Sequence, residues 1–420
     1  MLLRRILKDI RKSRQNKMAF KSENIGYNWA SDIIREKSEP RVVKSDYISP
    51  QKIKDENQYK PQLISWMDSL EDGFKKVSDD AQYIDTIREM RTAIVDILDS
   101  YHAGNISDSY EKMKNIISKM IAGTTGLAVS SIQKSFAFND MEDVLADSIH
   151  DTRIEFFRAR TSEKYCIFER KEMLHIPFDM RGNVSSARFS IPGLPCLYLG
   201  TTSYCCWLEL RTPADHQFNV SAVKINQEKK ILNLTMSADL FEQITMLTGT
   251  DKSANKYTIE ALKLWILSYA SSFKIDADKR SFKEEYIIPQ LIMLASKDLA
   301  LDGVSYFSKQ VEDDRFAYMI SVNLALFARY SGEKRFSEIC KDIELSPSYN
   351  YAMFKQLSYS EKHKSDSIEL HIKNSRSHKN IGGFNRQNEY ESTKFYNFDR
   401  YLFSHMAPEI QKIDVDGENK

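Results

Sequence analysis

The sequence has few cysteines, no long apolar run and no excess of charge of either sign. Its 420 residues include five cysteines, an odd number without a CxxC pair. This pattern argues against the disulfide framework of a small secreted protein and favours a reducing cytoplasm. The 60 basic and 59 acidic residues nearly cancel. The overall charge therefore draws the protein toward neither nucleic acid nor an anionic membrane.

Signals for a membrane or for secretion are also missing. No apolar run approaches the ~18 residues that span a bilayer, and the start of the chain lacks the apolar segment and cleavage site of a secretory signal. We expect a cytoplasmic protein with no membrane and no nucleic-acid partner. The basic segment MLLRRILKDIRKSRQNK, residues 1–17, either contacts a membrane surface, RNA or a partner, or forms a packed or frayed terminal helix. We favour the helix.

Several well-known catalytic motifs are absent. The chain has no GxGxxG after a strand, no GxxxxGK[ST], no HExxH and no GxSxG. Dinucleotide redox chemistry, P-loop phosphoryl transfer, zinc hydrolysis and α/β-hydrolase chemistry therefore lack their sequence marks. The eight histidines show no metal-ligand spacing, so we expect no metal and no bound cofactor.

The residues that are present indicate an α+β protein in four parts. Residues 1–59 form the basic segment and a linker, and residues 60–150 form a helical module. Apolar residues recur there at helical spacing from Ile84 to Tyr101 and again from Tyr110, with a turn at Gly104 between them. This hairpin is typical of a regulatory or oligomerisation module. Near residue 150 the pattern becomes aromatic and β-prone, and a second domain covers residues 151–400, followed by a tail at 401–420.

Local patterns predict the elements of this second domain. PCLYLG (195–200) reads as a buried strand, and TTSYCCWLELRTP (201–213) as a helix with its N-cap at Thr202 or Ser203 and its end at Pro213. Alternating patterns predict strands at 219–225 and 229–235, and helical periods predict helices at 258–273 and 290–300. A turn at Asp302 then precedes a short strand at 304–307.

Four separated pieces carry the candidate site: FFRAR (156–160), SARFSIPGLPCLYLG (186–200), CCWLELR (205–211) and DGVSYFSKQ (302–310). In this order they resemble the RES-domain family, which is named for its Arg, Glu and Ser residues. The resemblance covers about residues 150–310, with a weaker continuation to about 400 through ESTKFYNFDRYL. Two departures stand out. Ser186 and Ala187 replace the glycine pair before the family's arginine, and the long interval between Glu209 and Ser308 indicates an insertion near 214–280.

The resemblance implies an ADP-ribosyltransferase-like fold, in which two packed sheets form a cleft for NAD⁺. It implies an enzyme that consumes NAD⁺ as its substrate, by hydrolysis (an NAD⁺ glycohydrolase) or by phosphorolysis (an NAD⁺ phosphorylase). It also implies a bacterial toxin or defence effector, with an antitoxin or another regulatory protein as partner. A homo-oligomer is a further option for the helical module.

The chemistry of N-glycosidic cleavage assigns roles to the matched residues. Positive charge builds on the ribose in the transition state, so a carboxylate beside the sugar is favourable. Glu209 fits this role. Ser308, at a strand end, would orient the ribose or the nucleophile. The early arginine completes the implied catalytic set, and the pattern leaves open whether it is Arg158 or Arg160; we favour Arg158.

Four further residues are expected to bind the substrate. Arg188 would hold the pyrophosphate, because a planar guanidinium binds two phosphate oxygens at once. Tyr198 or Tyr306 would stack on a ring, and His175, just before the loop, would line the pocket or serve as a structural histidine. Two alternatives remain: an ADP-ribosyltransferase that modifies a macromolecule, and an inactive NAD-binding or interaction protein.

Overall fold

The computed structural model describes residues 52–53, 58–77, 80–123, 125–136, 155–236, 240–241, 244–245, 255–275, 280–310, 322–332, 334–362, 390 and 393–415. The expected basic segment at 1–17 and the expected domain boundary near residue 150 lie outside these residues. None of the described helices combines the length and the hydropathy needed to cross a membrane.

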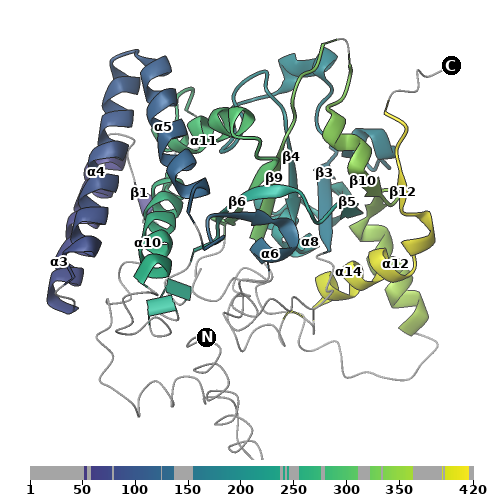
Figure 1. Ribbon diagram of the computed structural model, residues 1–420. Coiled ribbons are helices and arrows are strands. Elements are labelled where there is room, and N and C mark those ends of the chain that lie inside the picture. The colour runs from purple at the N-terminus through teal and green to yellow at the C-terminus, as the bar shows by residue number, and fades with distance from the viewer. Residues whose placement is uncertain are drawn as a thin grey trace, which may run out of the picture.

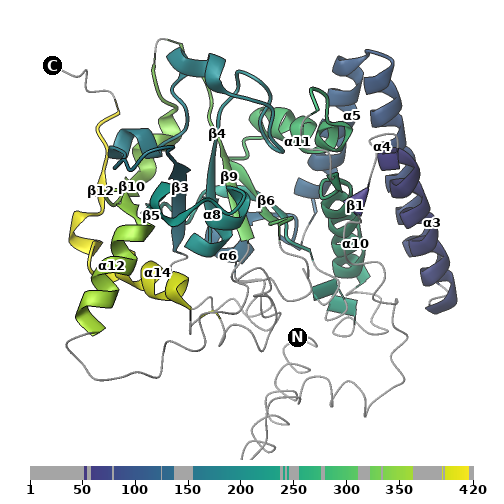
Figure 2. The ribbon, with the colours of Figure 1, turned by 180° about the vertical axis from the view of Figure 1, so that it is seen from behind.

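The described chain is an α+β protein in which helices flank a large mixed sheet (Figures 1 and 2). The principal helices are α3 (Tyr59–Val77), α4 (Ala81–His102), α5 (Ile106–Ile121), α6 (Ile132–Phe136), α8 (Ser203–Glu209), α10 (Asn255–Ala270), α11 (Ile287–Asp298), α12 (Tyr351–Lys362) and α14 (Lys394–Ser404). The strands are β1 (Lys52–Ile53), β2 (Val129–Ser131), β3 (Phe156–Thr161), β4 (Cys196–Gly200), β5 (Phe218–Ile225), β6 (Lys230–Leu234), β7 (Lys274–Ile275), β8 (Gly303–Phe307), β9 (Val322–Phe327), β10 (Ile343–Leu345), β11 (Tyr349–Asn350) and β12 (Gln411–Lys412).

Ten of these strands form one sheet in the order β12-β10-β5-β3-β4-β9-β8-β6-β2, with β11 paired to β5. Only β6 and β8 run parallel among its pairs in the described chain, and β1 and β7 form a separate parallel pair. The sheet is nearly divided in the middle. β3 pairs with β5 along its whole length, from Phe156 to Thr161, whereas β3 and β4 share the single pair Phe157 and Gly200. The two halves therefore diverge from this point, in place of the two separate packed sheets that the resemblance implies.

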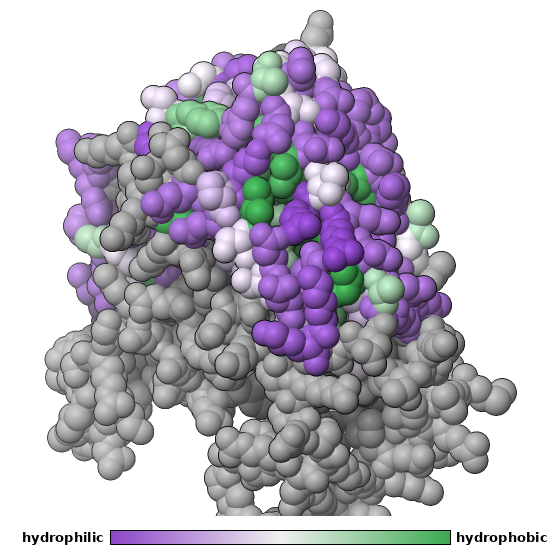
Figure 3. Space-filling view, turned by 90° about the vertical axis from the view of Figure 1, so that its left-hand side faces the viewer, coloured by the Kyte–Doolittle hydropathy of each residue, from purple (hydrophilic) through white to green (hydrophobic). Residues whose placement is uncertain are grey.

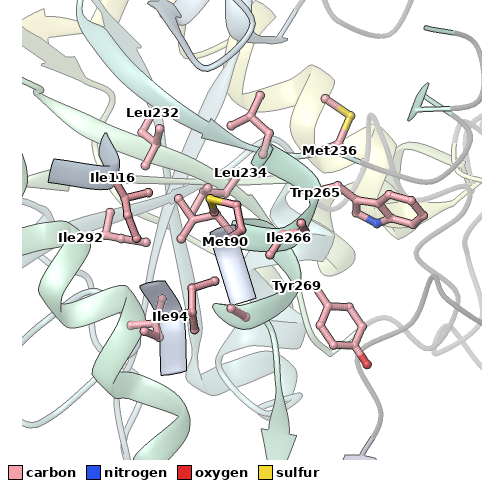
Figure 4. Packing of buried hydrophobic residues seen from close by; sticks show 14 of the residues in the cluster. Met90, Ile94, Ile116, Leu232, Leu234, Met236, Trp265, Ile266, Tyr269 and Ile292 are labelled. Atoms are coloured by element: carbon pink, nitrogen blue, oxygen red, sulfur yellow. The ribbon is translucent and has the colours of Figure 1, made fainter. Parts of the chain in front are cut away.

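The N-terminal helices share a hydrophobic core with one half of the sheet. α5 packs against α4 and α11, and α4 packs against α3 and α10. Figure 4 shows Ile94 of α4, Ile266 of α10 and Leu234 of β6 in the same cluster. Apolar faces of the amphipathic helices explain this arrangement, because each must be covered by another element.

The surface of these helices gives no sign of a large apolar patch. The space-filling view of this side is mainly hydrophilic, with small, separated hydrophobic areas (Figure 3). Glu71 of α3 takes part in two salt bridges, one with Arg88 of α4 and one with Lys75 of α3 itself, and the hydrogen bond from Arg88 lowers the pKa of Glu71 to about 2.

The other half of the sheet is covered by the C-terminal segment. α12 and α14 lie against β5 and α8 (Figure 1), and their aromatic rings make a second core. Tyr351 of α12 stacks on Phe395 of α14 at a centroid distance of 4.8 Å. Phe398 of α14 is fully buried in the same cluster. Aromatic pairs of this kind add to the free energy gained from burying their area.

Most of the elements predicted from sequence patterns are confirmed. The hairpin of α4 and α5 turns at Gly104, which has a φ of 81°, and β4, β5, β6, α10, α11 and β8 form where the patterns place them. Helix α8 begins after its N-cap Thr202, whose hydroxyl accepts a hydrogen bond from the Cys205 backbone N–H at 3.0 Å. It ends at Glu209, four residues before Pro213, because the chain turns into the left-handed conformation at Arg211.

Three segments differ from their expected organisation. β2, which precedes residue 150, is an edge strand of the main sheet paired with β6. β5, inside the expected insertion at 214–280, pairs with both β3 and β10. Within the expected tail, α14 continues to Ser404 and β12 pairs with β10. Strand pairing between residues far apart in the sequence places β2, β5 and β12 in the main sheet, and a local pattern does not encode the partner.

If the helices and the sheet share one core, a cavity in a helix should weaken the whole molecule. We expect Ile94→Ala, at a fully buried position in α4, to lower the free energy of unfolding by about 2–5 kcal/mol. Chemical denaturation followed by both helical circular dichroism and tryptophan fluorescence should show one shifted transition. Two separate transitions, with only one of them shifted, would show that the helices form an independent domain.

Candidate functional site

The site lies where the two halves of the sheet diverge. A cavity of about 320 Å³ is lined by residues of β3 and β4 and of the end of α8, and this volume is in the range of small-molecule pockets. Its lining residues come from five separated parts of the chain: Arg158, Ala159, Ala187, Arg188, Tyr198, Leu199, Gly200, Cys206, Glu209, Leu210, Arg211, Phe273, Lys274, Lys283, Glu285, Tyr286, Tyr306, Lys309, Gln310 and Asn323. Five of the seven predicted site residues are among them.

Arg158 crosses the gap between the two halves. Its Nε donates to the backbone oxygen of Met173 at 3.2 Å, and its Nη1 donates to the backbone oxygen of Tyr198 in β4, also at 3.2 Å. Burial, with a smaller contribution from Arg160, lowers the pKa of Arg158 to about 10, so the guanidinium stays charged at neutral pH. Arg160 points elsewhere and donates to the backbone oxygen of Glu172. Of the two arginines, Arg158 is the one that lines the cavity.

Arg188 fastens the loop before β4 to the opposite wall. Its Nε donates to the backbone oxygen of Ser271 at 2.7 Å, its Nη1 to the backbone oxygen of Phe307 at 3.2 Å, and its Nη2 to Ser272 Oγ at 2.9 Å. The guanidinium also lies 4.7 Å from the centre of the Tyr306 ring. Burial lowers the pKa of Arg188. This residue therefore both carries a positive charge into the cavity and holds its walls together.

Glu209 is the last residue of α8 and is exposed to the cavity. Its Oε1 accepts a hydrogen bond from Asn323 Nδ2 at 2.7 Å. The amide is neutral, so this contact orients the carboxylate without cancelling its charge. Helix α8 packs closely on β4 because Gly200 has no side chain: a Cβ there would lie 2.8 Å from Cys206 Sγ. A glycine at the end of β4 thus helps to set the position of Glu209.

A buried carboxyl from the C-terminal segment anchors the other end of α8. Asp399 of α14 is 5% exposed, and its Oδ1 accepts a hydrogen bond from the Ser203 backbone N–H at 3.1 Å. The Tyr390 hydroxyl donates to its Oδ2. Burial raises the pKa of Asp399 to about 7, with a small contribution from the negative charge of Glu155. The helix that carries Glu209 is therefore tied to a segment almost 200 residues away.

The two predicted tyrosines line the cavity, but their rings already have neighbours. The Tyr198 hydroxyl accepts a hydrogen bond from the Phe189 N–H at 3.2 Å and lies 2.9 Å from Ser190 Oγ. The Tyr306 ring packs against Phe189, with ring centres 4.8 Å apart, and against Arg188. Burial raises the pKa of both tyrosines well above the usual value, so both are protonated hydroxyls. In this structure they support the loop that carries Arg188.

The structure does not bring Ser308 or His175 to the described lining of this cavity. Ser308 is 1% exposed, and its Oγ accepts a hydrogen bond from the Gln310 N–H at 3.2 Å, which stabilises the turn after β8. His175 is also 1% exposed; its Nδ1 lies 2.7 Å from the Ile176 backbone oxygen and its Nε2 accepts from the Ser337 N–H at 3.0 Å. Burial lowers the pKa of His175. A neutral His175 ring with both nitrogens in hydrogen bonds fits the structural role, which was one of the two roles that the sequence allowed for it.

Sequence reasoning missed a group of polar lining residues. Lys274 follows α10, Lys283 precedes α11, and Lys309 and Gln310 follow β8, while Arg211 follows α8. No pattern connects these positions, although Lys309 and Gln310 directly follow the matched Ser308. Together with the two matched arginines they give the described lining six arginines and lysines against two glutamates. The cavity is thus suited to an anionic ligand.

No group of three or more possible metal ligands from His, Cys, Asp and Glu occurs within the part of the chain that the structure describes. Neither Cys206, which lines the cavity, nor its neighbour Cys205 is activated. Burial raises the pKa of Cys206 to about 12 and that of Cys205 well above its usual value. Because the thiolate is the nucleophilic form, neither position favours covalent catalysis.

Comparison with known proteins gives one relative in sequence. No protein-family model matches the chain. A Bacillus subtilis (strain 168) protein described as "Putative toxin YopC" is 33% identical over 229 residues, which are 51% of this chain and 51% of that protein. The chain therefore spans about half the length of this relative. A crystal structure of the M. tuberculosis MbcT-MbcA toxin-antitoxin complex aligns with a TM-score of 0.27 and 13% identity over 50% of this chain and 90% of that one, a similarity too low to establish a common fold.

The anchor of α8 should make stability depend on pH. The pKa of Asp399 is about 7 in the folded protein and about 3.9 for a carboxyl in an unfolded chain. Between these values the folded state binds more protons, so stability is lost as pH rises. We expect the free energy of unfolding of the wild type to fall from pH 5 to pH 7 relative to Asp399→Asn, by at most ~1.4 kcal/mol per pH unit. Urea denaturation at several pH values measures this difference, and parallel profiles for the two proteins would contradict it.

Proposed function

We propose that the protein cleaves the nicotinamide N-glycosidic bond of NAD⁺, by hydrolysis or phosphorolysis, and that it acts as a toxin or defence effector. The observation that carries the proposal is the position of Arg158, Arg188 and Glu209. These residues lie 21 or more positions apart in the sequence and yet line one cavity. Arg188 and Glu209 are residues that the sequence resemblance selects, and Arg158 is the one we favour of the two arginines, Arg158 and Arg160, that it leaves open. The similarity over 229 residues to the protein described as "Putative toxin YopC" supports the biological setting.

Cleavage of the N-glycosidic bond of NAD⁺ is favoured by a negative charge beside the ribose and by positive charge around the phosphates. The bond between the ribose C1′ and the nicotinamide nitrogen breaks, and its electron pair leaves with nicotinamide. A water or phosphate oxygen then bonds to C1′, and water releases one proton in the hydrolytic case. Glu209 would stabilise the positive charge on the sugar, since a preorganised charge needs no reorientation during the reaction. Asn323 would hold that carboxylate in place.

The substrate itself fits the charge of the cavity. The pyrophosphate of NAD⁺ carries two negative charges, and six of the described lining residues are arginine or lysine. Arg158 and Arg188 donate several of their N–H groups to protein oxygens. Their positive charges are therefore fixed in place, and their remaining N–H groups would be the donors to the substrate. In this proposal Ser308 acts indirectly, by shaping the turn that presents Lys309 and Gln310.

The first experiment is the release of nicotinamide from NAD⁺ by the purified protein, with and without phosphate. We expect turnover by the wild type and a loss of about 10²-fold or more in Glu209→Gln, because the charge that stabilises the transition state is removed. The matched control is Glu228→Gln, at an exposed turn between β5 and β6 and outside the described cavity lining. It should retain wild-type activity.

Different outcomes separate the alternatives. A requirement for phosphate would identify a phosphorylase, and turnover without it would identify a glycohydrolase. Label from adenine-labelled NAD⁺ that stays on protein or nucleic acid of a cell extract would identify transfer to a macromolecule. Binding of NAD⁺ by the wild type without any nicotinamide release would contradict an enzymatic function and favour a binding protein. Co-purification with a partner that suppresses turnover would support an antitoxin.

A further inference from the structure

The hydrogen bond from Asn323 to Glu209 is one end of a longer chain of contacts. Asn323 belongs to β9 and is 3% exposed. Its Nδ2 donates to Glu209 Oε1 at 2.7 Å, and its Oδ1 accepts a hydrogen bond from Cys205 Sγ at 3.2 Å. Cys205 and Glu209 are four positions apart in α8, so their side chains lie on one face of the helix. One amide therefore spans a full turn of α8 and contacts both of these side chains.

The register of the sheet places this amide beside α8. Asn323 pairs with Gly200 of β4, and directly paired residues of antiparallel strands have their side chains on the same face of the sheet. A Cβ at Gly200 would point toward α8, 2.8 Å from Cys206 Sγ and 3.4 Å from Cys205 Cβ. The Asn323 side chain therefore leaves the sheet on the face that α8 covers. Because Gly200 has no side chain, the amide has room to reach the helix.

The chemistry of the three groups determines which way the amide faces. A carboxylate only accepts hydrogen bonds, so Glu209 requires the nitrogen side of the amide, and the oxygen side then needs a donor. Cys205 can be that donor, because burial raises the pKa of its thiol well above the usual value and keeps it protonated. The Val322 backbone oxygen lies farther from the same sulfur, at 3.9 Å. A thiol that is inert as a nucleophile is thus suited to hold an amide in one orientation.

Glu209 needs this support because of its place in the fold. It is exposed to the cavity at the last position of a seven-residue helix, where an untethered glutamate side chain would populate several rotamers. In the proposed reaction the carboxylate faces one atom, C1′ of the ribose, and a small displacement of a catalytic group lowers the rate steeply. A single orientation of Glu209 therefore raises the rate of the chemical step without changing the affinity for the substrate.

We propose that Cys205 and Asn323 are positioning residues that act in series: the thiol fixes the orientation of the amide, and the amide fixes the catalytic carboxylate of Glu209. The inference rests on the proposed function for the reaction that Glu209 promotes. It gives the buried thiol a role that does not involve its reactivity. Substitution of either residue should lower kcat and leave the KM for NAD⁺ unchanged.

The kinetic test measures nicotinamide release by the full-length chain, well below the unfolding temperature of each variant. We expect Asn323→Leu to lower kcat by about tenfold or more, the usual weight of one hydrogen bond to a charged group, with an unchanged KM. Asn323→Asp keeps the shape of the side chain and the acceptor for Cys205, but it removes the donor to Glu209. It should lose at least as much activity, and it answers the question if the leucine variant does not fold.

The thiol is tested in the same assay. Cys205→Ala should lower kcat by about threefold or more, and Cys205→Ser should recover part of this loss because a hydroxyl also donates. In the Asn323→Leu background, Cys205→Ala should have no further effect, since the thiol acts only through the amide. The matched control is Cys340→Ala, which removes a fully buried thiol outside the described cavity lining. It should retain the wild-type kcat and KM.

Infrared spectroscopy measures the contact itself without any reaction. The S–H stretching band of Cys205 is identified by its loss in Cys205→Ala. A thiol that donates a hydrogen bond absorbs at a lower frequency than a free thiol, so the band should move to higher frequency in Asn323→Leu. The Cys205 band should stay in place in Cys340→Ala.

Failure of this inference and failure of the proposed function look different. Turnover by the wild type with an unchanged kcat in both Asn323→Leu and Asn323→Asp would overturn the positioning role and leave the enzyme in place. An equal loss from Cys205→Ala with and without Asn323 would overturn the role of the thiol. No turnover by the wild type, with the S–H band shifted in Asn323→Leu, would overturn the NAD⁺ reaction and retain the contact between thiol and amide.

Discussion

The cavity exists because β3 and β4 are neighbours in the sheet and yet pair at one position only, Phe157 with Gly200. On one side of this pair the strands continue into separate halves, each with its own partners. Backbone groups freed by the divergence need other hydrogen bonds, since buried polar groups are seldom left unpaired. Arg158 supplies one of them by donating to the Tyr198 backbone oxygen across the gap. A residue expected to serve catalysis is thereby also part of what holds the sheet together.

The same divergence makes α8 the critical element of the site. This short helix follows directly from β4 and packs against it at Gly200, so its end points toward the opening between the halves. Seven residues are too few for a helix that is stable by itself. Thr202 caps it locally, and Asp399 fixes it from the C-terminal segment. The position of Glu209 therefore depends on contacts made far from the cavity, among them the hydrogen bond that Asp399 accepts from the Ser203 N–H.

The cavity combines buried positive charges with one exposed carboxylate. Arginine charges are held inside despite the desolvation that lowers the pKa of Arg158 and Arg188, because carbonyl oxygens of β4, β8 and the end of α10 accept their hydrogen bonds. Glu209 faces them with a neutral amide as its partner. In the proposed N-glycosidic cleavage, the arginines and lysines would bind the anionic part of the substrate, and Glu209 would face the positive charge that develops on the sugar.

The sequence by itself determined the elements and the residue types of the site. Hydrophobic periodicity placed β4, β8 and α11, and the Thr202 cap placed α8. The order of four short pieces selected Arg188, Glu209, Ser308 and one of the two arginines Arg158 and Arg160, because these signals act over a few residues. Only the tertiary structure decided which side chains share the cavity. In the folded protein Ser308 and His175 are buried residues that stabilise the surrounding backbone. Arg211 and Lys274 both donate to Gln310. The N-terminal helices share one hydrophobic core with the sheet. These outcomes depend on strand register, on helix packing and on a turn in the left-handed conformation, which bring together residues that have no local relation in the chain.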